Sequence, residues 1–211
     1  LGRYRYLVVL TKDAPEHSRL SEFCHAVAEL DDKAAGAGID WRRAIEAAGS
    51  LFLEVTALDA RDALAGIGRA VIELGDVLLV VDEAQQVVDR NAPPDFLQLW
   101  TRGRKHGVSI VTITQSLKIG PTYGLNVVCR REATALVTFH KSDTEELKQL
   151  RELLQSAELA ERVPTLRTPR DGGRPEYIVR DLTTGRALLV SREGEVDMSA
   201  GAPAADAALN A

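Results

Sequence analysis

The sequence predicts an α/β fold with a mostly parallel sheet that is flanked by helices. Over residues 1–165 of the 211, short apolar runs alternate with helical patterns of about ten to sixteen residues, which is typical of strand–helix–strand units. Most of the apolar runs are continuous, as in strands buried on both faces of a sheet. After Pro164, two short strand patterns flank Thr183-Thr184-Gly185, which indicates a β-hairpin.

The individual elements follow from local patterns. Strands are expected at residues 4–11, 51–56, 77–81, 108–114 and 133–140. Helices are expected at residues 18–30, 40–48, 59–74, 94–105 and 142–155. Asp40, Asp59 and Ser142 are the expected helix N-caps, and Glu145 would complete a capping box with Ser142. Gly75 and Gly107 are expected to end two of the helices.

Three segments are expected along the chain. Residues 1–165 form the core, residues 166–197 form the hairpin extension, and residues 198–211 form an alanine-rich tail that we expect to be disordered.

Composition excludes several classes of protein. With 45% hydrophobic and 27% charged residues the chain is expected to fold, and its net charge of -5 excludes a uniformly basic nucleic-acid coat. Cys24 and Cys129 lie far apart and fit a reducing cytoplasm rather than a disulfide scaffold. The four histidines lack a metal-ligand spacing. The longest apolar runs, about five residues, are far short of the roughly 20 that a membrane helix needs, and no signal peptide is evident.

Two adjacent carboxylates, Asp82 and Glu83, follow the apolar run at residues 77–81. In open α/β sheets, ligands bind at the carboxyl ends of the strands. One carboxylate there can hold Mg²⁺ through its water shell, and the next can polarise an attacking water. The pattern also fits an ordinary strand followed by an acidic helix cap, and the pair alone does not decide between the two.

A second polar residue, Gln115, ends the strand pattern at residues 108–114. If this strand lies beside the one that carries Asp82, the neutral amide of Gln115 reaches the same crevice. There it can hydrogen-bond a terminal phosphate or the attacking water without adding negative charge. The alternative is a strand with a polar cap.

Basic residues are concentrated between residues 100 and 131, where there is no Asp or Glu. They are Arg102, Arg104, Lys105, Lys118, Arg130 and Arg131. This segregation indicates a surface that meets phosphate. The first three also fit a solvated helix end whose cations complement the helix dipole. The neighbouring arginines could lower the pKa of Cys129, which otherwise reads as a small, half-buried hydrophobic residue.

The stretches LLVVDEAQ and RGRKHGVSIVTITQS resemble the Walker B strand and the arginine-to-sensor strand of the HerA/FtsK superfamily of P-loop ATPases. YLVVLTKD resembles the strand that follows the nucleotide-binding helix in that family, and ATALVTFHKSDTEELKQL resembles the final sheet strand with its helix. The resemblance covers about residues 6–154. It implies a RecA-like sheet and a hexameric, DNA-pumping motor.

The resemblance also implies roles for individual residues, with ATP and Mg²⁺ as cofactors. Asp82 would be the Mg²⁺-associated acid, Glu83 the catalytic base and Gln115 the sensor, all three in contact with the nucleotide site. Arg104 would act on the neighbouring subunit's nucleotide as an arginine finger, with Arg102 as the alternative.

One departure from the family is the phosphate-binding loop G-x-x-x-x-G-K-[ST], because no Lys in this chain follows a Gly. In the family this loop precedes the strand at residues 4–11, so we expect the missing segment to lie upstream of residue 1. The alternative is a non-hydrolysing α/β subunit that keeps the fold and only docks partners.

The expected function is ATP-driven translocation of double-stranded DNA, in genome packaging or DNA transfer. Lys118, Arg130 and Arg131 are the candidate DNA contacts, through phosphates rather than bases. Six copies would form a ring in the host cytoplasm or on a virion, with a capsid or membrane portal as a further partner. An AAA-type ATPase is disfavoured, because those proteins usually carry Asn at the sensor and a helical lid after the core.

Overall fold

The protein is described by a computed structural model over residues 3–12, 19–117, 125–171 and 174–198. Most of the expected tail, residues 199–211, and the candidate DNA contact Lys118 lie outside these ranges. The chain divides into two compact units, Leu1–Glu132 and Ala133–Ala211. Within the described ranges, no helix has both the length and the apolar character to cross a membrane.

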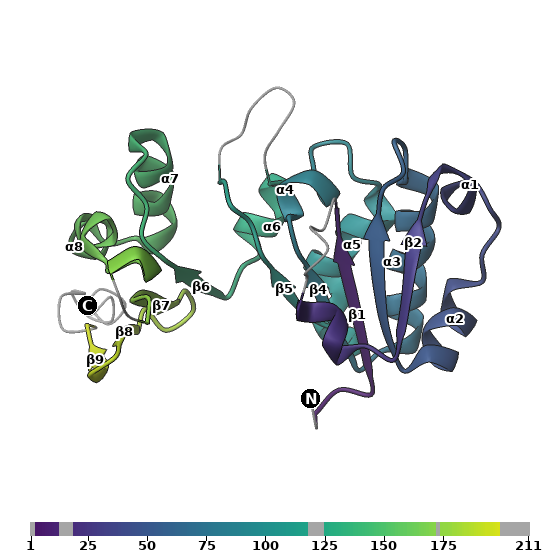
Figure 1. Ribbon diagram of the computed structural model, residues 1–211, viewed down its shortest axis with the longest axis horizontal. Coiled ribbons are helices and arrows are strands. Elements are labelled where there is room, and N and C mark those ends of the chain that lie inside the picture. The colour runs from purple at the N-terminus through teal and green to yellow at the C-terminus, as the bar shows by residue number, and fades with distance from the viewer. Residues whose placement is uncertain (1–2, 13–18, 118–124, 172–173, 199–211) are drawn as a thin grey trace, which may run out of the picture. The chain divides into compact units, whose positions relative to one another are not determined.

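The first unit contains a five-stranded, all-parallel sheet, which confirms the predicted fold class (Figure 1). The strand order is β2-β3-β1-β4-β5. The strands are β1 (Tyr6–Thr11), β2 (Ala26–Leu30), β3 (Ser50–Val55), β4 (Val77–Val81) and β5 (Ser109–Thr112). Because all five run in the same direction, their carboxyl ends lie along one edge of the sheet.

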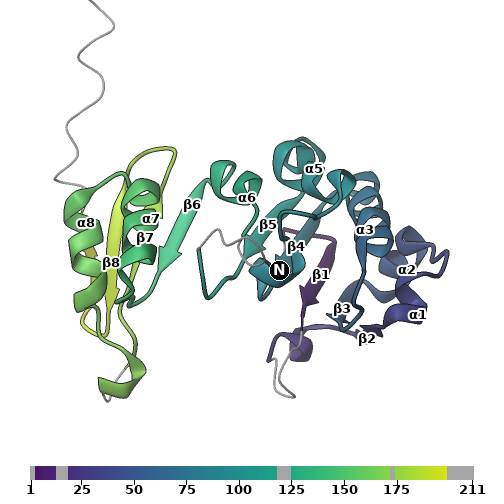
Figure 2. The ribbon, with the colours of Figure 1, turned by 90° about the horizontal axis from the view of Figure 1, so that it is seen from above.

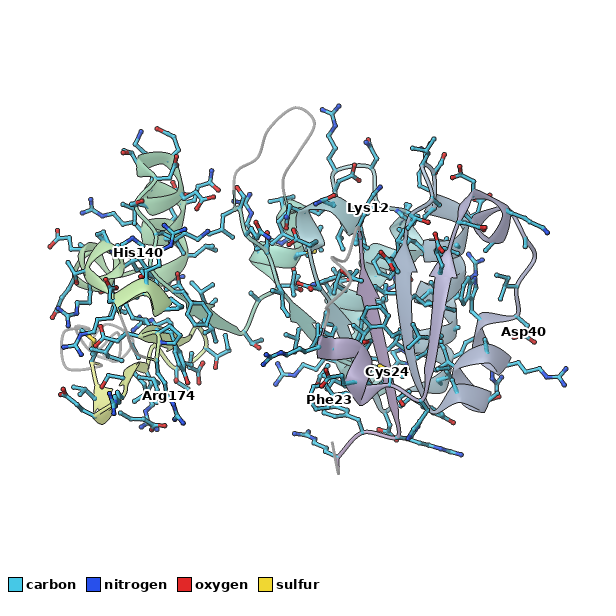
Figure 3. All side chains as sticks on the ribbon, viewed as in Figure 1. Lys12, Phe23, Cys24, Asp40, His140 and Arg174 are labelled. Atoms are coloured by element: carbon cyan, nitrogen blue, oxygen red, sulfur yellow. The ribbon has the colours of Figure 1, made fainter. Side chains whose placement is uncertain are left out.

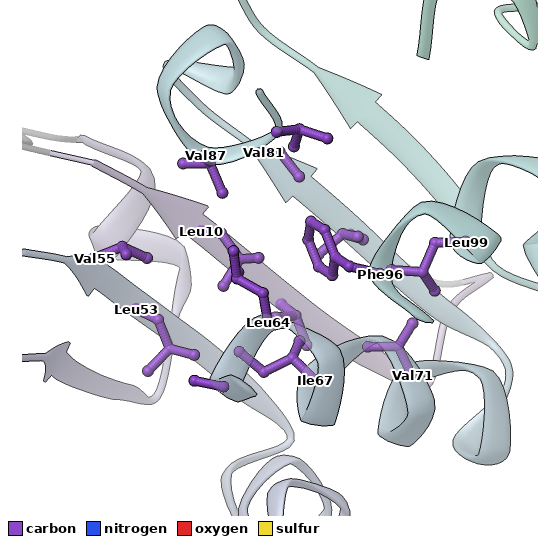
Figure 4. Close-up of a cluster of buried hydrophobic side chains, with 14 of the residues drawn as sticks. Leu10, Leu53, Val55, Leu64, Ile67, Val71, Val81, Val87, Phe96 and Leu99 are labelled. Carbon is purple, nitrogen blue, oxygen red and sulfur yellow. The ribbon is translucent and has the colours of Figure 1, made fainter. Parts of the chain in front are cut away.

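The helices of this unit gather mainly on one face of the sheet (Figures 1 and 2). They are α1 (Asp32–Ala35), α2 (Trp41–Ala48), α3 (Arg61–Leu74), α4 (Ala84–Val87), α5 (Pro94–Arg102) and α6 (Val127–Arg131), with 3₁₀ helices η1 (Arg19–Phe23) and η2 (Gly103–His106). Leu10 and Val81 from the strands, Ile67 from α3 and Phe96 and Leu99 from α5 pack together in the main core (Figure 4).

The opposite face of the sheet is covered less completely by the described residues. Its small cluster of buried side chains is Leu7, Val9, Phe52 and Val80, packed against Leu20 and Cys24 from the η1 region. At the β5 end, Val111 and Ile113 are 45% and 41% exposed, which is unusual for large apolar side chains in a parallel sheet.

The helix predicted at residues 18–30 is wrong. Leu20, Phe23, Val27 and Leu30 have helical spacing, but the chain forms η1 and then the strand β2, which pairs with β3. Phe23 and Val27 are each 63% exposed, whereas Leu30 is 1% exposed, so the apolar stripe that predicted a helix is not buried as one face. Parallel pairing of the backbone with β3 outweighs the helical periodicity here.

The helix ends agree with the sequence only in part. Asp40 caps α2 by accepting a hydrogen bond from the backbone N–H of Arg43 (3.0 Å), as predicted. The predicted caps Asp59 and Ser142 are wrong, because the N-cap positions are Ala60 and Asp143. Asp143 accepts bonds from the first free N–H groups of its helix, so an acidic side chain replaces the predicted hydroxyl cap.

The second unit is an antiparallel sheet with two helices. Its strands are β6 (Ala135–Thr138), β7 (Tyr177–Asp181), β8 (Ala187–Ser191) and β9 (Gly194–Asp197), and they lie in that order in the sheet. Its helices are α7 (Thr144–Leu154) and α8 (Ala157–Arg162), and two short 3₁₀ helices, η3 (Val163–Thr165) and η4 (Pro169–Asp171), follow them. The hairpin of β7 and β8 is confirmed, and β9 extends it. β6, expected as a strand of the first sheet, pairs with β7 instead. Residues 133–165 therefore belong to the hairpin unit.

Gly68 of α3 lies where this helix packs closely against the start of α5. A Cβ atom at Gly68 would lie 2.6 Å from the carbonyl oxygen of Asp95 and 2.8 Å from Cα of Phe96, both backbone atoms. In an open helix Gly→Ala is stabilising by about 1 kcal/mol. Here we expect Gly68→Ala to lower the free energy of unfolding by about 1–3 kcal/mol. Chemical denaturation measures it, with Gly38→Ala as control because no atom lies within 4 Å of a Cβ there. A stabilised Gly68→Ala protein would contradict this packing.

Candidate functional site

The backbone turns sharply where β4 ends. Glu83 adopts a left-handed conformation, with φ 48° and ψ 41°, and is the N-cap residue of α4 without making a side-chain cap bond. This conformation is costly for a residue with a long side chain, and it persists only where surrounding contacts hold it. Continued pairing supplies those contacts, because Ile113 N–H donates to Val81 O (2.8 Å) and Ala84 N–H donates to Ile113 O (2.9 Å).

The turn brings Glu83 against Gln115, from the segment after β5. Gln115 Nε2 donates to Glu83 Oε1, and Gln85 Nε2 donates to Glu83 Oε2 (2.6 Å). Thr114 Oγ1 in turn donates to Gln85 Oε1 (2.7 Å). Both carboxylate oxygens are therefore bonded to amides from two elements, and the sequence-predicted residues Glu83 and Gln115 lie together.

Gln85 and Thr114 are site residues that the sequence reasoning missed. Gln85 is buried, at 9% exposure, on the first turn of α4, and it links Glu83 to Thr114. A signal was present, because Gln85 follows Glu83 by two residues and Thr114 directly precedes Gln115. Neither spacing says which of the polar groups will meet, since that depends on the turn at Glu83.

Asp82 lies one residue before the turn, half-buried. Its backbone N–H donates to Leu10 O (2.8 Å), and its Oδ1 accepts from the backbone N–H of Glu83 (3.0 Å). In the described part of the chain no three acidic, histidine or cysteine side chains form a metal cluster by themselves. A Mg²⁺ ion at this edge would therefore rely on one or two carboxylates, which is its usual mode alongside phosphate and water.

A buried hydroxyl next to Asp82 fits such an ion. Thr11 ends β1, is 0% exposed, and its Oγ1 has no hydrogen-bond partner among the described residues. Lys12 follows it at the same edge of the sheet (Figure 3). The edge thus offers carboxylate and hydroxyl oxygens, which are the donor types that a hard cation takes.

The candidate arginine fingers lie at the other end of the strands. Arg104 is in η2, which precedes β5, and His106 O accepts from the N–H of Asp76 just before β4 (3.2 Å). The four-residue strand β5, about 13 Å long at 3.3 Å per residue, separates this end from Gln115. Arg102 is exposed and donates to Gln98 Oε1 (3.3 Å). The structure does not bring either arginine to Glu83 within one copy.

The remaining basic candidates lie on α6. Arg131 is exposed and pairs with Glu132 (3.0 Å), whereas Arg130 is half-buried. Cys129 lies on the same helix and is 4% exposed. Burial raises the pKa of its thiol to about 12. The idea that the arginines lower this pKa is wrong: desolvation dominates, and Cys129 is a buried apolar residue.

Comparison with known structures identifies the fold. The genome packaging NTPase B204 from Sulfolobus turreted icosahedral virus 2, in complex with AMPPCP, matches over 90% of this chain and 98% of that chain, with 16% identity and a TM-score of 0.58. The same protein in complex with ATP-gammaS matches over 87% and 95%, with 16% identity and a TM-score of 0.57. This chain has the fold of a viral packaging NTPase.

A third match has the same protein name. B204, the DNA-packaging ATPase from Sulfolobus turreted icosahedral virus, matches over 89% of this chain and 97% of that chain, with 15% identity and a TM-score of 0.54. No protein-family model matches the sequence, and no curated protein sequence is significantly similar to it. At these identities the packaging NTPases establish the fold of this chain.

Proposed function

We propose that this chain is the catalytic part of an ATP-driven, DNA-translocating motor of the HerA/FtsK type, acting in genome packaging or DNA transfer. The observation that carries the proposal is the bonding of Glu83 to Gln115 at the carboxyl ends of two neighbouring strands, in a chain with the fold of packaging NTPases. A carboxylate held by neutral amides is suited to act on a water molecule near phosphate.

In this mechanism Glu83 accepts the proton of the attacking water, and its two amide partners hold the carboxylate in one orientation. Gln115 can exchange its bond to Glu83 for a bond to the water or to the terminal phosphate. Gln85, fixed by Thr114, keeps the carboxylate in place when that exchange happens. Asp82, one residue before the turn, would hold Mg²⁺ through its water shell, and that ion would neutralise phosphate charge.

The phosphates of ATP need a cradle that this sequence does not contain. We propose that a further strand and helix supply the phosphate-binding loop by adding to the free edge of β5. β5 is the last strand of the described sheet, and the side chains of Val111 in β5 and Ile113 just after it are exposed. An apolar strand edge in this position is a template for another strand.

The partners follow from the motor proposal. Double-stranded DNA would meet Arg130, Arg131 and Lys118 through its phosphates, with no reading of sequence. A ring of six copies would place the exposed Arg104, or Arg102, of one copy at the nucleotide of the next. A capsid or membrane portal would anchor the ring, in the host cytoplasm or on the virion.

A non-hydrolysing subunit with the same fold is the second candidate, and one observation favours it. The sequence lacks G-x-x-x-x-G-K-[ST], whose amides and lysine hold phosphates in P-loop enzymes. A subunit that does not hydrolyse ATP would not need two carboxylates and an amide together at the carboxyl ends of neighbouring strands. Retention of Asp82, Glu83 and Gln115 therefore supports the motor.

The first prediction of the motor proposal separates these candidates by comparing the chain with and without an added phosphate-binding loop. We expect the chain of residues 1–211 alone to hydrolyse ATP far below the range of about one turnover per second and above that enzymes ordinarily reach, because it lacks the phosphate cradle. A phosphate-release assay measures this, and the same chain carrying an added P-loop strand and helix should be active. Turnover at or above about one per second by the chain alone would show that another element holds the nucleotide.

The second prediction concerns the base in the loop-bearing protein. Glu83→Gln keeps the shape of the side chain, and its amide partners can rotate to match, so nucleotide binding should persist. Loss of the base should lower hydrolysis by about 10²–10⁴-fold. Steady-state hydrolysis and nucleotide titration measure the two effects. Glu73→Gln, the same change at an exposed position on α3, is the control. A rate within a few-fold of the unaltered protein would reduce Glu83 to a helix cap.

The third prediction concerns the arginine finger. Because Arg104 lies at the opposite end of the strands from Glu83, it can act only on another copy's nucleotide. Arg104→Ala should lower turnover by about 10³–10⁵-fold and leave nucleotide affinity of an isolated subunit unchanged. Lys105→Ala, an exposed change in the same turn, is the control.

Mixing then tests whether the site is shared between copies. Arg104→Ala subunits combined with Glu83→Gln subunits would form some interfaces in which both groups are intact, so activity should return. Absence of recovery in mixed assemblies that are shown to form would rule out Arg104, and the same experiment with Arg102 would follow.

A further inference from the structure

A row of oxygen-bearing side chains crosses the first sheet near its carboxyl edge. Glu29 of β2 pairs with Glu54 of β3, and Glu54 pairs with Thr11 of β1. Leu10 of β1 pairs with Val81 of β4. The backbone N–H of Asp82, which follows Val81, donates to Leu10 O, so the parallel pairing of the two strands extends by one residue. Asp82 therefore takes the position beside Thr11.

The four side chains of the row belong to the same face of the sheet. Paired residues of parallel strands point the same way, and successive residues alternate between the faces. Thr11 follows Val9 by two residues, and Asp82 follows Val80 by two, and both valines belong to the smaller buried cluster. The row thus lies on the less covered face, with Thr11 between two carboxylates.

Thr11 is the exceptional member of the row. Glu29 accepts a hydrogen bond from Thr56 Oγ1 (2.7 Å), and Asp82 accepts one from the backbone N–H of Glu83 (3.0 Å). The Thr11 side chain is completely buried, yet its hydroxyl has no partner among the described residues. Buried hydroxyls nearly always have a partner, so an orphan hydroxyl in register with two carboxylates is a position that a water molecule or an ion can complete.

We propose that the Thr11 hydroxyl is a ligand of the Mg²⁺ ion of the nucleotide site, the ion that Asp82 holds through its water shell. This assignment rests on the proposed function for the identity of the ion and deepens it by adding a ligand. Adjacent strands are about 4.8 Å apart, so side chains on neighbouring strands can converge on one cation. A hydroxyl oxygen without a partner in the described residues has its lone pairs available for the ion.

The available lone pair explains why a hydroxyl stands at this place. A third carboxylate between Glu54 and Asp82 would add repulsion, and a valine would offer no lone pair to the ion. Mg²⁺ in proteins is commonly held by one or two carboxylates with water and phosphate completing the shell.

The test is cation binding without nucleotide, with Mn²⁺ as the probe and Mg²⁺ as competitor. Thr11→Val keeps the shape of the side chain and removes the hydroxyl, whereas Thr11→Ser keeps the hydroxyl. We expect Thr11→Val to weaken Mn²⁺ binding by about tenfold or more, a typical loss for a group that supports a metal site, and Thr11→Ser to retain it. Electron paramagnetic resonance of free Mn²⁺ measures the affinity.

Stability provides the second readout. Without metal, the thermal midpoint of Thr11→Val should equal or exceed that of the unaltered chain, because an orphan buried hydroxyl is removed. Thr138→Val is the control, since that buried hydroxyl donates to Phe139 O and lies in the other unit, so it should leave Mn²⁺ binding unchanged.

Two outcomes would overturn the assignment. One is Mn²⁺ affinity of Thr11→Val within twofold of the unaltered chain, and the other is no Mn²⁺ binding by the unaltered chain at millimolar concentration. The outcome is separable from that of the motor proposal, because neither measurement involves ATP or DNA. Thr11-dependent Mn²⁺ binding in a chain that hydrolyses no ATP even after a P-loop strand and helix are added would support the cation ligand and reject the motor.

Discussion

The parallel pairing of β1, β4 and β5 is the constraint on which the rest of the site depends. Parallel strands end together, so the residues that follow them share one edge without any long-range contact between side chains. The main-chain bonds that continue beyond the strands, from Asp82 to Leu10 and between Ile113 and Val81, extend this order by a residue or two. That extension places Asp82 beside Thr11 and Gln115 beside Glu83.

Strain and hydrogen bonding balance each other at Glu83. The left-handed backbone conformation there costs free energy of order 1–3 kcal/mol, and a glutamate side chain does not favour that conformation. The turn is held from both sides, by the pairing of Ala84 with Ile113 and by the two amides on the carboxylate. A helix cap would need neither a strained residue nor two amides on its carboxylate, and Glu83 makes no cap bond. The geometry therefore favours a group held ready for chemistry.

The sequence could predict what depends on short-range pattern. The apolar run at Val77–Val81, the cap at Asp40 and the hairpin around Gly185 each carry their own local signal, and each is present. It could not predict pairing partners. β2 lies in a stretch with helical apolar spacing, of which Phe23 and Val27 remain exposed, and β6 joins the second sheet because a strand pattern does not specify its neighbour. Within the site, Asp82, Glu83 and Gln115 were predictable from strand ends. Gln85 was not, because its contact depends on the turn at Glu83.

Charge is divided between the two ends of the first sheet, and this division limits what one copy can do. The carboxyl edge holds carboxylates, amides and the Thr11 hydroxyl, with Lys12 beside them, whereas Arg102 and Arg104 are exposed at the amino ends. A triphosphate at the carboxyl edge carries several negative charges toward Asp82 and Glu83, which a cation and further donors must offset. Those arginines cannot reach it from the same copy across the length of β5. If this edge hydrolyses ATP, the proposed metal ion, added phosphate loop and second copy are the sources that would supply the compensating charge.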